Sequence, residues 1–269
     1  MNRNGEVGFG QRIQLDWLDR TATLYIAGLT KDEIEESLQD FLRDRLSIGS
    51  DSRSGNRALT ILILLKVWVV VPHGLESLRD EGLELLQRLP SKQHLVVHWG
   101  MVMAVYPFFQ ALAETVGRLL RLQGTVAASQ VQRRMREQFG ERSTVERATR
   151  RTLRCLIDWG VLKETQEKGI YQATATISVN DTKLAHWLIE TSLIASGSAS
   201  STLKGITKNP ALFPFATESI SIKGLESHGR LEVLHQGLDE DVIMLRGGVA
   251  KGRFPAQYND GVPFRIQRE

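Results

Sequence analysis

The sequence predicts a mainly α-helical protein with a winged helix-turn-helix and a small C-terminal β-containing region. Three observations lead to this prediction. Apolar residues recur at helical spacing through roughly the first 120 residues. Two amphipathic helices separated by a tight turn follow Gly124, and a β-hairpin pattern comes directly after them. Further along, Leu231–Leu234 and Val242–Arg246 flank a turn and resemble paired strands.

Length and composition are ordinary for a folded protein. A chain of 269 residues, 42% hydrophobic and 24% charged, is long enough for two or three packed units and is neither disordered nor collagen-like. The single cysteine, Cys155, cannot form an internal disulfide, and Met1–Gly10 lacks a signal-peptide pattern, so we expect a cytoplasmic protein. Lys66 interrupts the longest apolar run, Ile61–Val71, which is shorter than the roughly 20 residues of a membrane span.

We divide the chain into a helical bundle (1–122), a winged helix-turn-helix (123–195), a small α+β region (202–250) and a tail (251–269). In the bundle, Gly28 ends a first helix, and Thr30 with Glu33 has the capping-box spacing that starts a second. Pro107 breaks the last apolar stretch. The predicted helices cover 12–27, 30–46, 57–71, 75–89 and 93–122, with a loop at 47–56; β-branched residues leave a strand open for 57–71.

The central segment has the element order of a winged helix. Thr125 is placed to cap a helix that ends at Phe139, and Ser143 or Thr144 to cap a second helix, Val145–Trp159, which Gly160 ends. Residues 161–165 and 170–179 then have the sequence pattern of two strands joined by a turn. Downstream we expect a helix at 181–195, a flexible linker at 196–201, a short helix with an apolar knot at 202–215, and two or three strands in 219–246.

Positive charge is concentrated in this central segment. Residues 118–154 hold ten arginines against three glutamates, a net charge of +7, whereas the rest of the chain sums to −4. On the second helix, four arginines lie opposite the apolar face: Arg147, Arg150, Arg151 and Arg154. Because like charges repel, an anionic partner would stabilise such a face. A solvated arginine-rich surface is the alternative interpretation.

We therefore expect a non-catalytic protein that binds double-stranded DNA, with the second helix in the major groove and the hairpin tip on the adjacent backbone. The predicted DNA-binding residues are Arg133, Arg134, Arg136, Arg142, Arg147, Arg150, Arg151, Arg154 and Lys168. Winged helices also serve as protein-binding modules. The alternative is thus an adaptor that docks a protein partner in a multi-subunit complex without binding DNA directly.

Other chemistry receives little support from the sequence. Phosphate-binding glycine loops are absent from it. His94 and His98 have a metal-compatible spacing on a helix, but the neighbouring sequence offers no cysteine or acidic third ligand, so we expect packed or surface histidines. We expect Asp16 and Asp19 to be solvated and Cys155 to be a buried thiol. The prediction is accordingly no catalytic residue, no metal and no cofactor.

A family resemblance rests on short runs within residues 10–165. The helical N-terminal half, the Tyr106-Pro107-Phe108 turn, and the arginine-rich helix from Ser143-Thr144 to Trp159-Gly160-Val161-Leu162 together resemble accessory protein A of bacterial BREX phage-exclusion systems. The resemblance implies a helical DNA-binding protein with winged-helix-like units and no catalytic site. It also implies an antiviral defence role beside a larger methyltransferase or ATPase machinery. The region after Asp181 departs from the family because it is longer and partly β.

Overall fold

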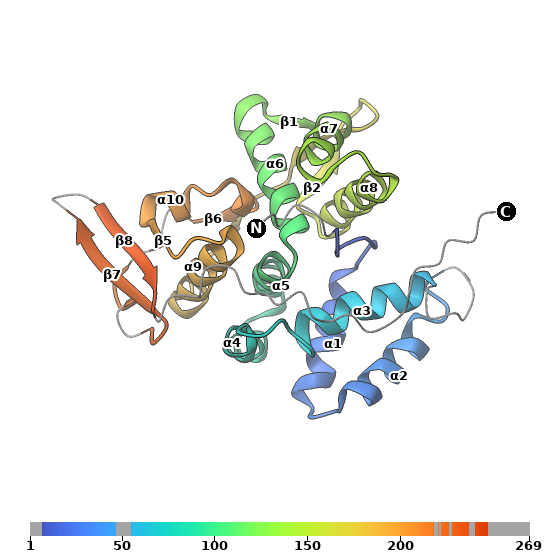
Figure 1. Ribbon diagram of the computed structural model, residues 1–269, viewed down its shortest axis with the longest axis horizontal. Helices are drawn as coiled ribbons and strands as arrows, with labels where there is room; N and C mark the ends of the chain where they lie inside the picture. The colour runs from blue at the N-terminus through green and yellow to red at the C-terminus, as the bar shows by residue number, and fades with distance from the viewer. Residues whose placement is uncertain are drawn as a thin grey trace.

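The computed structural model describes residues 7–46, 55–217, 220, 222–225, 228–236 and 240–246. In this part of the chain the protein is mainly helical, with ten α-helices and three small sheets. Figure 1 shows helix α5 (Ser91–Val105) near the centre, with the N-terminal helices, the central segment and the C-terminal strands around it. The predicted loop at 47–56 lies almost entirely outside the described residues, as does the predicted tail at 251–269.

The helices predicted for the first 122 residues are confirmed, with shifts at their ends. Thr30 and Glu33 form the predicted capping box, but the helix that follows ends at Leu42 rather than Leu46. The segment predicted at 57–71 is a helix and not a strand, and it ends at Trp68 rather than Val71. Pro107 occupies the first position of a new helix, where its missing N–H costs nothing. The helices are α1 (Leu15–Ile26), α2 (Lys31–Leu42), α3 (Asn56–Trp68), α4 (Glu76–Arg88), α5 (Ser91–Val105) and α6 (Pro107–Gln123).

Helix α5 is the core of the molecule. Every residue from Leu95 to Val105 is buried. A helix that is apolar all round needs partners on every side. Helices α1, α3, α4 and α6 supply part of this cover, and α9 (Thr182–Ser196), from much later in the chain, supplies another large part.

The central segment contains a short strand that the sequence did not indicate. Thr125 lies in this strand rather than capping a helix, and its neighbour Val126 is fully buried and pairs with Tyr171. The second helix begins at Ser143, so neither Ser143 nor Thr144 is its cap. Three strands form an antiparallel sheet in the order β1-β3-β2. The elements are β1 (Thr125–Ala127), α7 (Ala128–Phe139), α8 (Ser143–Asp158), β2 (Leu162–Glu164) and β3 (Ile170–Ala173).

The C-terminal region combines short elements with a hairpin. The predicted return strand 170–179 ends at Ala173, because the chain crosses there to a second sheet, where β4 (Ile177–Ser178) pairs in parallel with β6 (Phe215–Ala216). The predicted linker 196–201 runs into β5 (Ser200–Thr202), which pairs with β8 (Glu240–Leu245). The predicted strand pair is confirmed as β7 (Leu231–Gln236) and β8 (Glu240–Leu245). The remaining elements are α10 (Leu203–Thr207) and a 3-10 turn, η1 (Pro210–Leu212).

Trp99 of α5 joins the core to the later parts of the chain. Its ring centroid lies 5.0 Å from that of Phe109 and 6.1 Å from that of Trp159. Phe213 and Phe215 each pack 5.6 Å away, edge to face. Edge-to-face pairs of this kind contribute about 0.5–1.5 kcal/mol beyond the area they bury. One side chain thus holds α6, the end of α8 and the turn after η1 together.

Within the described ranges, no single helix has the length and apolar character of a membrane span. Helices α5 and α6 meet that description only as a pair, by length and composition, and they are bent by 118° where they meet.

Gly117 allows η1 to lie directly on α6, and its substitution tests this packing. A Cβ atom at position 117 would lie 1.9 Å from the carbonyl oxygen of Pro210. Alanine gains about 1 kcal/mol of helix propensity over glycine. Because backbone cannot rotate away as a side chain can, the overlap outweighs that gain, and we expect Gly117→Ala to lower the free energy of unfolding by about 1–3 kcal/mol in urea titrations.

Gly10→Ala is the matched control for this substitution. A Cβ atom at position 10 meets nothing within 4 Å, so its free energy of unfolding should change by less than about 0.5 kcal/mol. A Gly117→Ala protein as stable as the native chain would contradict the close packing of η1 on α6.

Candidate nucleic-acid interface

Helix α8 has a buried face and an arginine face. Val145, Ala148 and Leu156 are buried against the rest of the protein, whereas Arg147 and Arg150 lie on the opposite side and are exposed. Arg154, one turn further, shares this exposed face. The spacing of three and four residues places these arginines in one row. Over seven residues, the row extends about 10 Å along the helix axis.

The three exposed arginines differ in their partners. Arg147 and Arg150 form no ion pair with any residue in the described part of the chain. The guanidinium of Arg154 lies 2.8 Å from a carboxylate oxygen of Glu164 on β2, and both side chains are about half exposed. Arg147 and Arg150 therefore have their full charge available for an anionic partner, whereas Arg154 is partly neutralised.

Arg151 departs from the predicted face. It lies at the edge of the arginine row, is half-buried, and donates a hydrogen bond of 2.8 Å to the carbonyl of Gly10. Burial lowers the pKa of Arg151, and the like charges of Arg147 and Arg150 lower it further. A helical projection includes only the residues of the helix itself, so it could not predict that a segment containing Gly10, 141 residues earlier, covers Arg151.

That covering segment is residues 9–14, which we call the N-terminal strap. The backbone N–H of Ile13 donates to the Cys155 sulfur at 3.1 Å, and the indole of Trp159 donates to the Ile13 carbonyl at 2.9 Å. Arg12 forms an ion pair with Asp158 through two hydrogen bonds. Burial acts to raise the pKa of Asp158, but the hydrogen bonds of Arg12 and Gln14 hold that pKa below its ordinary value. The strap covers one flank of α8 and leaves the arginine face open.

The other predicted DNA-binding arginines lie on α7 and in the turn before α8, and they differ in their partners. On α7, Arg133 and Arg134 share the carboxylate of Glu137, at 3.7 and 3.2 Å, whereas Arg136 is exposed without an ion pair in the described residues. Arg142, in the turn between α7 and α8, donates to the carbonyl of Phe139 at 3.0 Å. This bond satisfies a free carbonyl at the end of α7. Arg142 thus has a structural role in addition to any contact it makes outside the protein.

The turn between β2 and β3 presents Lys168 to solvent at its tip. The backbone of Thr165 and that of Ile170 close this turn, and the carbonyl of Gly169 accepts from Ala128 at the start of α7. The turn also carries exposed Glu167, while Glu164 lies at its base. Within residues 165–169 the charges of Glu167 and Lys168 cancel, so Lys168 contributes a single positive group.

A polar cluster that the sequence did not predict lies between α1 and α5. Asp19 is not simply solvated, because His94 and His98 both contact its carboxylate, at 2.8 and 2.9 Å. Burial acts to raise the pKa of Asp19, but the hydrogen bonds and charges of His98 and His94 hold it below its ordinary value. Complete burial lowers the pKa of His98. The acidic residue absent from the sequence near His94 thus comes from a helix 75 residues earlier.

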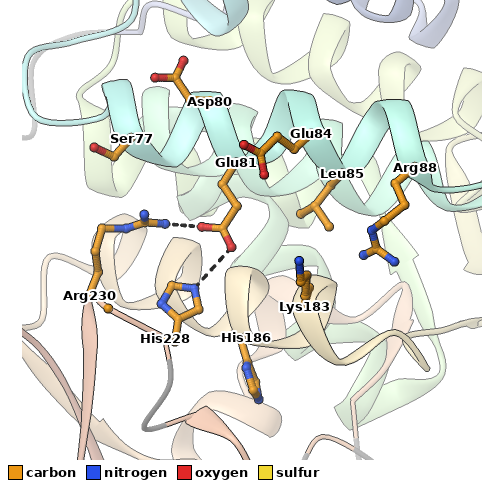
Figure 2. A pocket seen from close by; sticks show the side chains of 11 residues that line it. Ser77, Asp80, Glu81, Glu84, Leu85, Arg88, Lys183, His186, His228 and Arg230 are labelled. Carbon is orange, nitrogen blue, oxygen red and sulfur yellow. Dashed lines mark hydrogen bonds and ion pairs between the residues drawn. The ribbon is translucent and has the colours of Figure 1, made fainter.

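A second polar cluster lines a cavity of about 540 Å³ between α4, α9 and residues 228–230, which directly precede β7. Figure 2 shows Arg230 and His228 converging on Glu81. The guanidinium of Arg230 also bonds both carboxylate oxygens of buried Glu190, at 2.7 and 2.8 Å, and these bonds raise the pKa of Arg230. Because Arg230 already occupies both carboxylates, we interpret this cluster as an ion pair that holds β7 to the helical core.

Cys155 allows the position of the strap to be tested. The thiol is fully buried under residues 11–13, and burial raises its pKa to about 12. We expect a thiol reagent at neutral pH to label Cys155 far more slowly in the native protein than in denaturant, since the thiolate is the reactive form. Arg12→Ala should accelerate native labelling by about fivefold, because the loss of an ion pair in which Arg12 is half exposed costs on the order of 1 kcal/mol.

Arg20→Ala serves as the control, since Arg20 lies on α1 and does not contact the strap. Its labelling rate should equal that of the native chain. Labelling of the native protein as fast as in denaturant would show that the strap does not cover α8.

Comparison of the chain with protein-family models, with curated proteins and with solved structures found no match in any of the three. The resemblance to the BREX accessory protein A family therefore stays a prediction from the short runs that carry it.

Proposed function

We propose that residues 107–173 form a winged helix that binds duplex DNA through α8. The element order α6-β1-α7-α8-β2-β3, with an antiparallel sheet in the order β1-β3-β2, supports this assignment. In helix-turn-helix proteins the second helix of the pair enters the major groove. Helix α8 occupies that place here, and the β2–β3 turn takes the place of the wing.

The observation that carries the proposal is the exposed face of α8. Arg147 and Arg150 are exposed without acidic partners in the described residues, and Arg154 extends their row by one turn. Three cations so close together repel one another unless an anion lies across them. The phosphates of a duplex provide a dense row of anions. A guanidinium also has the geometry to donate two hydrogen bonds to the edge of guanine.

Flanking groups extend the proposed contact surface. Arg136 on α7 and Lys168 at the turn tip are exposed, and we expect them to contact phosphates beside the groove. Arg133, Arg134 and Arg142 already have partners, so we assign them smaller contributions. Arg151 contributes to the local positive potential while remaining bonded to the strap.

A salt titration with an arginine variant tests the proposal. Binding of the native chain to a fluorescent duplex should weaken steeply with salt, because each phosphate contact adds about −0.9 to the slope of log affinity against log salt. We expect the triple variant Arg147→Ala/Arg150→Ala/Arg154→Ala to reduce the magnitude of that slope by about 2.7. Fluorescence anisotropy over a salt series provides the measurement.

The control removes the same charge elsewhere. Arg20→Ala/Arg43→Ala/Arg45→Ala takes three arginines from α1 and the region around the end of α2 and should leave the slope unchanged. Equal losses in both triple variants would indicate a non-specific charge effect. A folded native chain without DNA affinity at low salt would sink the proposal and favour the adaptor that docks a protein partner.

Glu164 provides a test in the opposite direction. Its carboxylate competes with phosphate for Arg154 and adds a negative charge beside the arginine face. Glu164→Gln removes the charge at nearly constant shape, so we expect tighter duplex binding by about threefold to tenfold at low salt, in keeping with a gain of about 1 kcal/mol from an exposed pair. The same anisotropy assay reports this change.

Glu167→Gln, on the same turn, separates the ion pair from the general charge effect. Glu167 has no ion pair with an arginine in the described residues, so this variant should tighten binding less than Glu164→Gln does. Unchanged or weaker binding by Glu164→Gln would place Arg154 outside the contact surface. A role beside a defence methyltransferase or ATPase stays a prediction from the family resemblance.

A further inference from the structure

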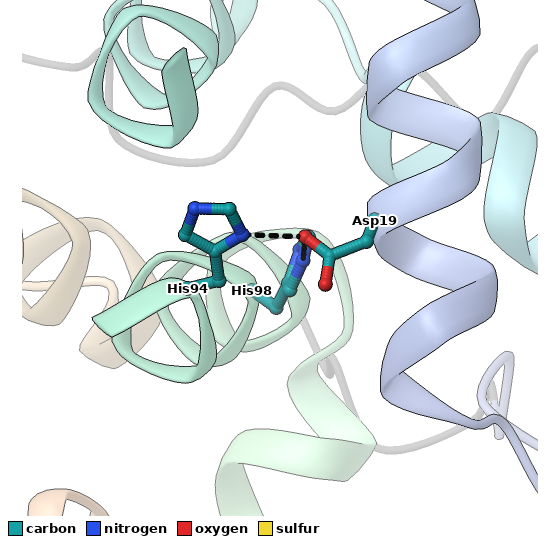
Figure 3. Close-up of side chains that lie close together, drawn as sticks. All are labelled: Asp19, His94 and His98. Carbon is teal, nitrogen blue, oxygen red and sulfur yellow. Dashed lines mark hydrogen bonds and ion pairs between the residues drawn. The ribbon is translucent and has the colours of Figure 1, made fainter. Parts of the chain in front are cut away.

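Three ligand atoms converge where α1 packs on α5. The Nδ1 atom of His94 lies 2.8 Å from Oδ1 of Asp19, and the Nε2 atom of His98 lies 2.9 Å from the same oxygen. All three atoms lie within 4.8 Å of one another. Figure 3 shows the two histidines, one turn apart on α5, facing the carboxylate of α1. Two imidazoles and one carboxylate form a ligand set that binds transition metals.

The hydrogen bonds of His94 assign its ring protons. Nε2 of His94 lies 3.1 Å from the backbone carbonyl of Leu89, and a carbonyl only accepts, so Nε2 carries a proton. In a neutral imidazole, Nδ1 then presents a lone pair, and that lone pair points at a carboxylate oxygen 2.8 Å away. Two facing acceptors need a cation between them, which is either a second proton on His94 or a metal ion.

The bond to Leu89 is also the contact that metal-binding histidines commonly make. A metal-ligating histidine usually donates its other ring N–H to a carbonyl or carboxylate, which fixes the tautomer and the ring orientation. His98 is held differently: its ring is fully buried and packs edge to face on Trp68, with centroids 5.5 Å apart. Both rings are therefore oriented before any ion binds.

The cluster opens on one side into a cavity of about 470 Å³. Exposure of the side chains rises from 0% for His98 to 18% for His94 and 40% for Asp19, so the open side lies toward the carboxylate. Lys92 is the charged neighbour on the rim. The apolar wall of the cavity is made by Leu15, Leu95, Trp159 and Ile177.

We propose that Asp19, His94 and His98 bind a single Zn²⁺ ion that keeps an exchangeable water on the cavity side. Zinc takes imidazole nitrogen and carboxylate oxygen at about 2.0–2.2 Å, whereas Mg²⁺ and Ca²⁺ select oxygen ligands. Tetrahedral coordination at these lengths requires the ligand atoms to separate by about half an ångström, which side-chain rotation supplies. Three protein ligands with an open fourth position distinguish this arrangement from a closed structural zinc site.

The second polar cluster does not compete for this assignment. Glu81, Glu190 and His228 also lie within reach of one another, but the guanidinium of Arg230 bonds both carboxylates. A second cation there would face that fixed positive charge. Asp19, by contrast, contacts only the two imidazoles among the described residues.

Zinc binding to the full chain tests the proposal. The protein is freed of metal with a chelator, and Zn²⁺ is then titrated against a competing chromophoric chelator. We expect one high-affinity ion per chain in the native protein. Asp19→Asn and His94→Gln should each weaken binding by about 100-fold or more, because even the loss of an outer hydrogen-bonding partner costs 10–100-fold.

Controls separate this site from surface histidines and from unfolding. His73→Gln/His235→Gln removes two exposed histidines and should leave affinity and stoichiometry unchanged. Circular dichroism without zinc should show that Asp19→Asn is folded, and zinc should raise the unfolding temperature of the native chain but not that of Asp19→Asn. Equal zinc affinity of native and Asp19→Asn proteins, or loss of binding in the surface-histidine control, would overturn the proposal, because zinc would then bind elsewhere on the chain. A native chain that binds no zinc would also overturn it and leave a second proton on His94 as the cation. The outcome is independent of DNA affinity.

Discussion

The complete burial of α5 is the constraint on which the rest of the structure depends. From Leu95 to Val105 the helix has no face toward solvent, so other elements must cover it all round. Gly100 makes part of this cover possible, since a Cβ atom there would lie 2.5 Å from the Trp187 ring of α9. The indole N–H of Trp187 is in turn satisfied by the Leu78 carbonyl of α4. A helix from residue 182 onward thereby belongs to the same core as the first helices.

The same constraint positions the proposed DNA-binding surface. Trp99 of α5 contacts Trp159 directly after α8, and the N-terminal strap bonds Cys155 and Asp158 on the adjoining flank. Helix α8 is therefore anchored through its C-terminal half. Arg147 and Arg150, in the N-terminal half, project away from these contacts. A rigid anchor at one end and a charged face at the other suit a helix that presents arginines to a partner.

The burial of α5 also explains why Asp19 lies where it does. His98 is the one ionisable side chain between Leu95 and Val105, and an isolated buried imidazole without a partner is costly. Asp19 of α1 supplies a partner for His98 and for His94 beside it. Trp159 lines the cavity beside this cluster and also follows the last turn of α8. The proposed zinc site and the proposed DNA-binding helix are thus neighbours, built on the same buried helix.

The sequence by itself determined the features that depend on neighbouring residues. Periodicity located the helices around α5 and the β7–β8 pair. Single residue types located the capping box of Thr30 and the break at Pro107. Each of these features depends on residues within a few positions. Periodicity also predicted an exposed face of Arg147, Arg150, Arg151 and Arg154, of which Arg151 is half-buried against the strap. The three-residue strand β1 gave no detectable alternation, since it is defined by pairing with Tyr171 more than forty residues later.

Only the tertiary structure decided which distant side chains meet. The strap over Arg151, the pairing of Arg154 with Glu164 across a turn, and the approach of Asp19 to His94 each join residues whose separation in sequence has no periodic pattern. Burial of apolar surface, which is not directional, drives these elements together. The polar partners are then set by how the packed elements align, and that alignment is a property of the whole chain.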